Sequence, residues 1–188
     1  MINSNKVSIV GGAGHVGTPL GLVLSSKGYN VALIDKNQKN IKKINQGKMP
    51  FVEEGCPALL KKMIYKKKIF ATNQLSEVTK SKFIIICIGT PVNNKRDPNL
   101  KNFLNFFFSL KKYLQKNHVI IVRSSIYPGT CQKVFDIIKS KCKNLSYCPE
   151  RIAQGQSLKE LPHISQIVSG TNNKAKLESG KIFKKVCK

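Results

Sequence analysis

The chain is poor in acidic residues and has no CxxC pair and no long apolar run. Nine aspartates and glutamates stand against 33 lysines and arginines, which gives a formal charge of +24. No stretch approaches the roughly 18 consecutive apolar residues of a membrane span, and the amino end does not resemble a signal peptide. We therefore expect a cytoplasmic protein with reduced thiols and no membrane association.

The six cysteines also lack the paired Cys/His spacing of a metal site. This absence argues against a zinc site and against a disulfide framework, so no bound metal is expected. Cys87 lies inside an apolar run, where a thiol behaves as a small core group. Cys148 has no identifiable activating neighbour in the sequence, and we interpret it as structural.

Arginine is scarce despite the high positive charge: the chain contains Arg96, Arg123 and Arg151 only. Arginine reads phosphates and bases better than lysine does, because its planar fork binds them in two places at once. The lysines are spread over the whole length, which indicates a general compositional bias. We expect weak, salt-sensitive adhesion to polyanions but no specific nucleic-acid partner.

What the chain does contain is a regular alternation of strand and helix patterns. It predicts an α/β fold, a Rossmann-like doubly wound parallel sheet with helices on both faces, formed by one domain over residues 1–188. Strands are predicted at residues 6–10, 30–34, 69–72, 82–88, 119–122, 144–147 and 166–169. Helices are predicted at residues 15–26, 37–45, 56–65, 99–114, 130–140 and 173–186. The aromatic side chains of the fourth helix, Phe103, Phe106, Phe107, Phe108 and Tyr113, are interpreted as its buried face.

A glycine-rich turn follows the first predicted strand and opens the first predicted helix. This context makes the pattern typical of a dinucleotide site, whereas the glycine spacing alone would be weak evidence. Gly12 is expected to allow the tight turn, Gly14 to let a pyrophosphate approach the backbone, and Gly17 to let helix and strand pack closely. The predicted cofactor-binding residues of this turn are Gly12, Ala13, Gly14, His15, Val16 and Gly17.

Asp35 ends the second predicted strand, 18 residues after Gly17. Its carboxylate can accept hydrogen bonds from both hydroxyls of an adenosine ribose and would repel a 2′-phosphate, so NAD is predicted in preference to NADP. Lys36 and Lys39 weaken this preference without reversing it. The alternative is a glycine-rich turn in a doubly wound domain that binds something else.

Three further turns fall where predicted strands end, which is where ligands bind in open α/β sheets. The first contains Gly89, Thr90 and Pro91. The second runs over residues 123–130 and carries the hydroxyls of Ser124 and Ser125. The third runs over residues 147–155 and carries Glu150.

Taken in this order, the motifs resemble the amino-terminal domain of the UDP-glucose/GDP-mannose dehydrogenase family. Residues 45–55 add a match to the family's NxGxxPxxExG segment, and the likeness covers residues 6–170. The CPER form at residues 148–151 is more similar to the branch that acts on UDP-N-acetyl-hexosamines than to the UDP-glucose branch.

The resemblance implies oxidation of a UDP-sugar at C6, from alcohol to carboxylate, with two NAD⁺. It implies that Gly89, Thr90, Pro91, Ser124 and Ser125 lie along the cofactor, and that Ser125 and Glu150 are catalytic. Ser125 would help to position a water, and Glu150 would act through water or as a general base. The implied substrate-binding residues are Glu150, Arg151, Ile152, Ala153 and Gln154. Two departures are notable: Gln154 replaces an acid of the UDP-glucose branch, and Asn40 replaces an arginine that contacts the cofactor, with Lys39 beside it as a substitute.

Simpler interpretations stand beside these. Ser124 and Ser125 could cap a helix or satisfy a turn. Glu150 and Arg151 could form an exposed surface pair. His15, His118 and His163 are isolated in sequence, and none is predicted to be catalytic.

The family's central and C-terminal domains, with an active lysine and a cysteine nucleophile in a GGxC segment, have no counterpart here. We therefore expect the chain to bind NAD without turning over substrate alone, with missing domains or a partner chain supplying the cysteine. The alternative is a stand-alone NAD-binding regulatory module. The first hypothesis predicts a large uncovered apolar face near the carboxyl end, and the second predicts a closed polar surface there.

Overall fold

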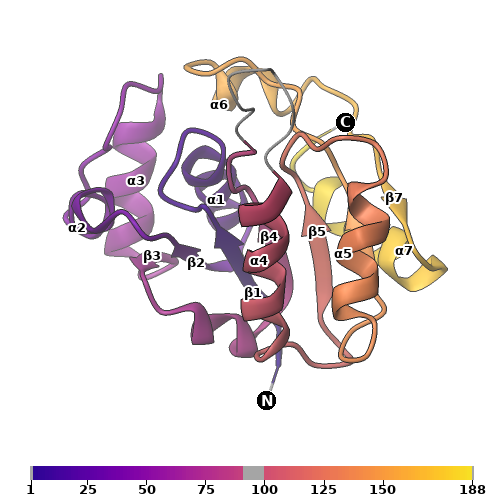
Figure 1. The fold of residues 1–188 in the computed structure, drawn as a ribbon. Helices are drawn as coiled ribbons and strands as arrows, with labels where there is room; N and C mark the ends of the chain where they lie inside the picture. The colour runs from indigo at the N-terminus through magenta and orange to yellow at the C-terminus, as the bar shows by residue number, and fades with distance from the viewer. Residues whose placement is uncertain (1, 91–99, 188) are drawn as a thin grey trace, which may run out of the picture.

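The computed structural model describes residues 2–90 and 100–187, and within them it shows the predicted α/β sandwich (Figure 1). The strands are β1 (Asn3–Val10), β2 (Asn30–Ile34), β3 (Ile69–Thr72), β4 (Ser81–Ile86), β5 (Val119–Val122), β6 (Leu145–Tyr147) and β7 (Ser169–Gly170). The helices are α1 (Gly17–Ser26), α2 (Gln38–Asn45), α3 (Cys56–Tyr65), α4 (Leu100–Lys111), α5 (Thr130–Ile138), α6 (Ser157–Glu160) and α7 (Asn173–Phe183), with a 3₁₀ turn η1 (Leu75–Lys80).

The strands form one sheet in the order β3-β2-β1-β4-β5-β6-β7. β1 pairs in parallel with β2 on one side and with β4 on the other, so Val7 lies between Val31 and Phe83. The chain builds the sheet outward from β1 through β3 and then returns to continue from β4. The strand order therefore reverses between β1 and β4, the point where such sheets bind ligands.

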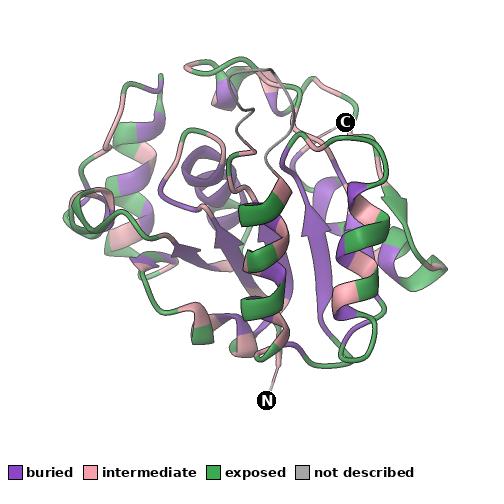
Figure 2. Cartoon of the chain, in the orientation of Figure 1, coloured by how far each residue is buried: buried purple, intermediate pink, exposed green. Residues whose placement is uncertain are grey.

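Helices cover both faces of the sheet, as the alternation of strand and helix patterns predicted. Val7 and Ile9 belong to one core cluster, with residues of α1, α3 and α7. Ile84 and Ile86 belong to a second cluster, with residues of α4 and α5. Figure 2 shows the central strands buried and the outer surfaces of α4 and α5 largely exposed.

The last strand departs from the parallel arrangement of the other six, which the sequence predicted. β7 is two residues long, begins at Ser169 and runs antiparallel to β6. A parallel neighbour needs a crossover that carries the chain back to the start of the preceding strand. Here the segment between β6 and β7, which includes α6, remains near the carboxyl ends of the strands (Figure 1). β7 therefore starts from that edge.

Smaller differences concern β4 and α4. β4 ends at Ile86, two residues before the predicted end, and the short elements η1 and α6 were not predicted. Phe103 and Phe107 are buried as expected, but Phe108 is 57% exposed, because it lies on the outer side of α4. Within the described residues, no helix combines the length and apolar character of a membrane span.

Candidate functional site

The candidate site lies at the carboxyl ends of the parallel strands, where backbone hydrogen bonds connect the turns that leave the sheet. The amides of Gly11 and Gly12 donate to the Ile34 carbonyl at 2.9 and 3.1 Å. The amide of Cys87 donates to the Val10 carbonyl at 2.7 Å, and that of Arg123 to the Ile86 carbonyl at 2.9 Å. The predicted turns therefore emerge side by side from one rigid edge.

The glycine-rich turn depends on four glycines with different roles. Gly11, which was not predicted, has the positive φ of 74° that makes the tight turn, so the role expected of Gly12 belongs to Gly11. A Cβ on Gly12 would lie 2.7 Å from the Cα of Leu33, and one on Gly17 would lie 2.5 Å from the Gly11 carbonyl oxygen. The chain is packed so closely at both positions that only glycine fits, as predicted for Gly17.

Gly14 differs from these three. A Cβ there would meet only the Gly11 carbonyl oxygen, at an ordinary contact distance of 3.5 Å. Packing within the described residues therefore does not require glycine at this position. The free space beside its backbone fits the approach of a cofactor pyrophosphate.

The turn continues into α1, which begins at Gly17 with Val16 as N-cap and no side-chain capping bond. The start of a helix carries amide groups and a positive dipole end that suit phosphate. His15 is exposed and stacks on Phe51, with ring centroids 3.9 Å apart. The segment that precedes α3 therefore contacts the glycine-rich turn, which the sequence did not indicate.

Asp35 lies beside the same turn. Its carboxylate binds a backbone amide of the turn and a backbone amide of the segment that follows Asp35. Oδ2 accepts a hydrogen bond from the Ala13 amide and Oδ1 accepts one from the Asn37 amide, both at 3.0 Å. Each carboxylate oxygen has a second acceptor site, so the carboxylate keeps capacity for ribose hydroxyls. The Ala13 amide, in contrast, is engaged within the protein, so it is not free to meet a phosphate.

A cavity of about 550 Å³ opens between this turn and α4. It has the size of a nucleotide pocket, and Asp35 stands at its wall. It is lined in part by four residues with no predicted site role: Asn73, Leu75, Asn102 and Phe106. The full lining is Val10, Gly11, Gly14, Ile34, Asp35, Lys36, Asn73, Leu75, Cys87, Ile88, Gly89, Asn102, Phe103 and Phe106. The residues without a predicted site role lie just after strand ends or in the first turns of the following helix. These positions are the signal that could have identified them.

The structure brings the predicted Thr90 and serine turns together. The Thr90 hydroxyl donates to the Ser125 carbonyl oxygen at 2.6 Å. The Ser124 hydroxyl is buried and donates to the Ile88 carbonyl oxygen at 2.7 Å, whereas Ser125 is exposed. Neither serine caps α5, whose N-cap is Gly129. Pro91 lies outside the described residues.

The guanidinium that pairs with Glu150 is that of Arg123, and not that of Arg151 as in the surface-pair alternative. Arg123 at the end of β5 is only 1% exposed, and its Nε and Nη2 lie 2.7 and 2.6 Å from Glu150 Oε2. The other oxygen, Oε1, accepts from the amides of Arg151 at 2.8 Å and Ile152 at 3.1 Å. The carboxylate is therefore fixed by four donors at the edge of the sheet.

Two further groups complete the setting of Arg123. Its Nη1 donates to Gln166 Oε1 at 2.7 Å, and its guanidinium carbon lies 5.0 Å from the centre of the Phe183 ring. The sequence predicted no role for Arg123, Gln166 or Phe183, which are far apart along the chain. A basic residue ending an apolar strand was the available signal for Arg123.

The loop that contains the predicted substrate-binding residues is exposed at Arg151, Ala153 and Gln154. The Arg151 guanidinium donates to the Ser165 carbonyl oxygen, and the Ala153 amide donates to Glu160 Oε2 at 3.0 Å. Ile152 is half-buried and packs against the core. The Arg151 side chain is therefore held against the same loop, by Ser165.

Glu53 connects this loop to the rest of the domain; the sequence placed it in the NxGxxPxxExG match of residues 45–55 but predicted no role for it. Its carboxylate is buried and accepts from the Gly155 amide at 3.0 Å and the Ser157 amide at 2.7 Å. Since Ser157 begins α6, Glu53 caps that short helix from a distant part of the chain.

The family model of the UDP-glucose/GDP-mannose dehydrogenase family, NAD binding domain, matches residues 5–187. The chain belongs to this family. The resemblance seen in the sequence is thereby confirmed, and NAD is the cofactor of the domain.

Individual members of the dehydrogenase family cover almost all of the chain. The UDP-N-acetyl-D-mannosamine dehydrogenase of Methanococcus vannielii is 32% identical over 183 residues, which are 95% of this chain and 42% of that protein. The UDP-glucose 6-dehydrogenase of Rickettsia felis is 27% identical over 178 residues, which are 93% of this chain and 39% of that protein. The solved UDP-D-ManNAc dehydrogenase of Pyrococcus horikoshii superposes with a TM-score of 0.90 at 26% identity, covering 97% of this chain and 45% of that chain. The chain thus spans less than half the length of these dehydrogenases.

Cys148 and Cys87, which lie in the turns of the candidate site, are unsuited to act as nucleophiles. Burial raises the pKa of Cys148 to about 12, against a smaller opposing effect of Arg123. Burial likewise raises the pKa of Cys87 to about 12. A thiol with so high a pKa is not a thiolate at neutral pH, so the structural interpretation of Cys148 is supported.

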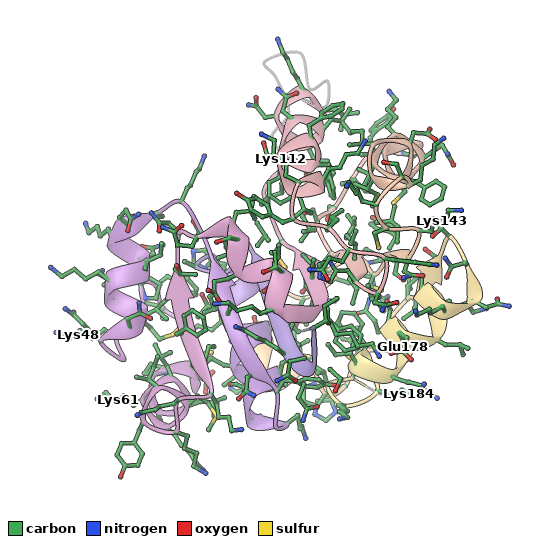
Figure 3. The ribbon with its side chains drawn as sticks, turned by 90° about the horizontal axis from the view of Figure 1, so that it is seen from below. Lys48, Lys61, Lys112, Lys143, Glu178 and Lys184 are labelled. Carbon is green, nitrogen blue, oxygen red and sulfur yellow. The ribbon has the colours of Figure 1, made fainter. Side chains whose placement is uncertain are left out.

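The lysines of this NAD-binding domain are dispersed. Figure 3 shows Lys48 and Lys61 on one side of the molecule, Lys112 on another, and Lys143 and Lys184 on a third. This distribution supports the interpretation of a general lysine bias over that of a single polyanion surface.

The apolar surface near the carboxyl end is smaller than the large uncovered face predicted for a partial enzyme. Among the described residues beyond β6, the large apolar side chains with more than half of their surface exposed are Ile167 and Leu177. Two such side chains are common on a domain surface, so this surface does not support the partial-enzyme hypothesis, which rests instead on the family match and on the partial coverage of the relatives.

Proposed function

We propose that the chain is the cofactor-binding part of a nucleotide-sugar 6-dehydrogenase that oxidises a UDP-N-acetyl-hexosamine at C6 to the carboxylate. The observation that carries the proposal is the fixed Glu150 carboxylate, which lies at the end of the sheet shared with the glycine-rich turn. A carboxylate at the strand ends of a dinucleotide-binding sheet is placed for proton transfer beside the cofactor.

In this proposal the glycine-rich turn and Asp35 bind the two ends of the ADP part of the cofactor. The free space beside Gly14 receives the pyrophosphate, and Asp35 accepts from the ribose hydroxyls. Residues Ala13, His15 and Val16 shape the turn, with Gly12 and Gly17 packing it against β2 and α1. When bound, NAD⁺ accepts the hydride that leaves the sugar carbon.

Glu150 is proposed to orient water or to accept its proton. All four acceptor sites of its carboxylate are occupied in the structure, and the Ile152 amide at 3.1 Å is the most distant donor. If the Ile152 amide moves away, water can bind at the Oε1 acceptor site that it leaves. Arg123 continues to hold the other oxygen, Oε2. Ser125, exposed beside Thr90, is proposed to position the same water or the reacting oxygen.

Thr90, Gly89, Pro91 and Ser124 are proposed to border the cofactor, and the segment from Arg151 to Gln154 to contact the sugar nucleotide. The nucleophilic thiol and the active lysine are proposed to come from sequence or a partner chain outside these 188 residues. The raised pKa values of Cys87 and Cys148 support this. The six free cysteines are compatible with the cytoplasm, where thiols stay reduced.

Calorimetry with NAD⁺ tests the cofactor half of the proposal, and an assay of NADH formation with a UDP-N-acetyl-hexosamine tests the rest. We expect the chain to bind NAD⁺ and to form no uronate until the polypeptide that carries the thiol is added. Absence of NAD⁺ binding would overturn the proposal. Uronate formation by the chain alone would overturn the claim that the thiol comes from elsewhere. A stand-alone regulatory module would bind NAD⁺ but would gain no activity from any added dehydrogenase segment.

A further inference from the structure

The peptide group that follows Ala13 is held by a side chain for which the sequence suggested a different task. Asn40, in the first turn of α2, donates from Nδ2 to the Ala13 carbonyl oxygen at 3.1 Å. Asp35 holds the amide of the same residue at 3.0 Å. Asp35, just after β2, therefore holds the N–H of Ala13, and Asn40, in α2, holds its C=O.

The grip on the carbonyl fixes the direction of the next amide. A trans peptide is planar, so its C=O and N–H point to opposite sides, and the described part of the chain has no cis peptide. With the Ala13 oxygen turned toward α2, the Gly14 N–H must point the other way. It faces the Gly11 carbonyl oxygen at 3.4 Å, a long hydrogen bond that a stronger acceptor can replace. Gly11 and Gly14 both line the 550 Å³ cavity.

Asn40 itself is pre-positioned. Asn37 is the N-cap of α2 and its Oδ1 accepts from the Asn40 amide at 3.1 Å. The Asn37 amide in turn donates to Asp35 Oδ1 at 3.0 Å. Asp35, Asn37 and Asn40 therefore form one connected unit, so the Asn40 side chain reaches Ala13 from a backbone that is already ordered.

We propose that Asn40 is a positioning residue for the cofactor pyrophosphate: by holding the Ala13 carbonyl, it fixes the Gly14 N–H toward the Gly11 carbonyl at the cavity wall, where a phosphate oxygen can take the place of that distant acceptor. Asn40 acts through the peptide and does not touch the ribose. The inference rests on the NAD-binding half of the proposed function and is independent of the sugar. A diphosphate is the ligand class that this amide recognises, because phosphate oxygens are strong acceptors for backbone N–H groups.

Two variants test the proposal, Asn40→Ala and the isosteric Asn40→Asp, each of which removes the N–H donor. Asn45 offers a matched control on the same helix, because its side chain donates to the Ala71 carbonyl at 2.8 Å and accepts from the Ala71 amide at 2.7 Å. Asn45→Ala therefore removes a comparable contact between side chain and backbone, but at β3. Calorimetry with NAD⁺, ADP-ribose and adenosine then separates pyrophosphate binding from nucleoside binding.

We expect Asn40→Ala to weaken NAD⁺ and ADP-ribose by about 3- to 10-fold, the worth of one hydrogen bond, and to leave adenosine unchanged. Asn40→Asp should weaken both diphosphates at least as much. Asn45→Ala should lower the melting temperature but leave all three affinities within twofold. That contrast excludes a general loss of stability as the cause.

Unchanged NAD⁺ affinity in both Asn40 variants would overturn the proposal. So would equal weakening of adenosine, which would place Asn40 at the ribose, or equal weakening by Asn45→Ala. If Asn40→Ala does not fold, Asn40→Asp decides the matter. Absence of NAD⁺ binding by the unmodified chain would show instead that the proposed function has failed, and the positioning role with it.

Discussion

Arg123 and Glu150 form a two-nitrogen ion pair in which the guanidinium is almost fully buried and the carboxylate side chain is 15% exposed. Removal of one partner from such a pair leaves the other charge unsatisfied. Arg123→Met should therefore lower the free energy of unfolding by about 2–3 kcal/mol, and the double variant with Glu150→Gln should recover part of this loss. Urea denaturation measures the cycle.

The exposed pair of Lys159 and Glu54, 2.7 Å apart, supplies the control for this cycle. Lys159→Met should change stability by less than about 1 kcal/mol, since water screens both charges. Strictly additive losses in the Arg123 and Glu150 variants would contradict the pairing.

The glycine-rich turn predicts opposite outcomes for two alanine substitutions. Gly12→Ala would place a Cβ 2.6 Å from the Ile9 carbonyl oxygen, so it should destabilise the domain by about 3 kcal/mol. Gly14→Ala has room and should change stability by less than about 0.5 kcal/mol, while weakening NAD⁺ about tenfold by obstructing the pyrophosphate. Thermal unfolding and calorimetry together distinguish them. Wild-type NAD⁺ affinity in Gly14→Ala would contradict the assigned phosphate position.

Asp35 should control the choice between NAD and NADP. Asp35→Ala removes the charged acceptor for the ribose and for the Ala13 amide, and should weaken NAD⁺ by about 10- to 100-fold. It should also narrow the difference between NAD⁺ and NADP⁺, because no carboxylate then repels the 2′-phosphate. Parallel titrations with both cofactors measure this, and an unchanged ratio of the two dissociation constants would refute the assignment.

Glu53 should govern the order of the loop that follows Glu150. Glu53→Gln places an amide NH₂ against a backbone N–H, at a local cost of about 1–3 kcal/mol, so the Gly155 and Ser157 amides should lose about tenfold or more of their hydrogen-exchange protection. Glu54→Gln is the matched control, because Glu54 is exposed. Equal effects of the two substitutions would show that burial of Glu53 is irrelevant.

His118 should make stability depend on pH. The ring is buried and its Nδ1 accepts from the Gln115 amide at 3.1 Å, while Nε2 has no hydrogen-bond partner among the described residues. Burial lowers the pKa of His118, and a contact with the Thr79 backbone opposes this only in part. The unfolded chain therefore binds a proton at higher pH than the folded chain does, and stability present above pH 6.5 is lost as the pH falls below it.

Urea denaturation at pH 7.5, 6.5 and 5.5 tests this dependence. One proton accounts for a slope of at most about 1.4 kcal/mol per pH unit, and His118→Asn should flatten the profile. A profile with the same slope in the variant would assign the effect to another group.

Local patterns were sufficient to indicate the first half of the candidate site. The glycine-rich turn, α1 and Asp35 lie within 35 residues and follow from strand, turn and helix signals. The role of Gly11 was not predicted, because the positive φ depends on how the turn meets Cys87 across the sheet. The antiparallel β7 depends on the path of the loop before it, which leaves no periodic signal.

Contacts between distant residues were beyond prediction. Arg123 meets Glu150, Gln166 and Phe183 only after β5, β6 and α7 have assembled. Glu53 reaches Gly155 across 102 positions of sequence. Spacing along the chain contains no information about such pairs, so the sequence indicated Glu150 as a candidate but not the residues that hold it.

The two borders of the sheet differ in what they offer to another polypeptide. β7 presents two residues, too few for an added strand to form a stable ladder, whereas β3 presents four. Lys66 and Lys67 are exposed just before β3 and put positive charge at that border. Edge-to-edge aggregation is thereby discouraged at one border by shortness and at the other by charge.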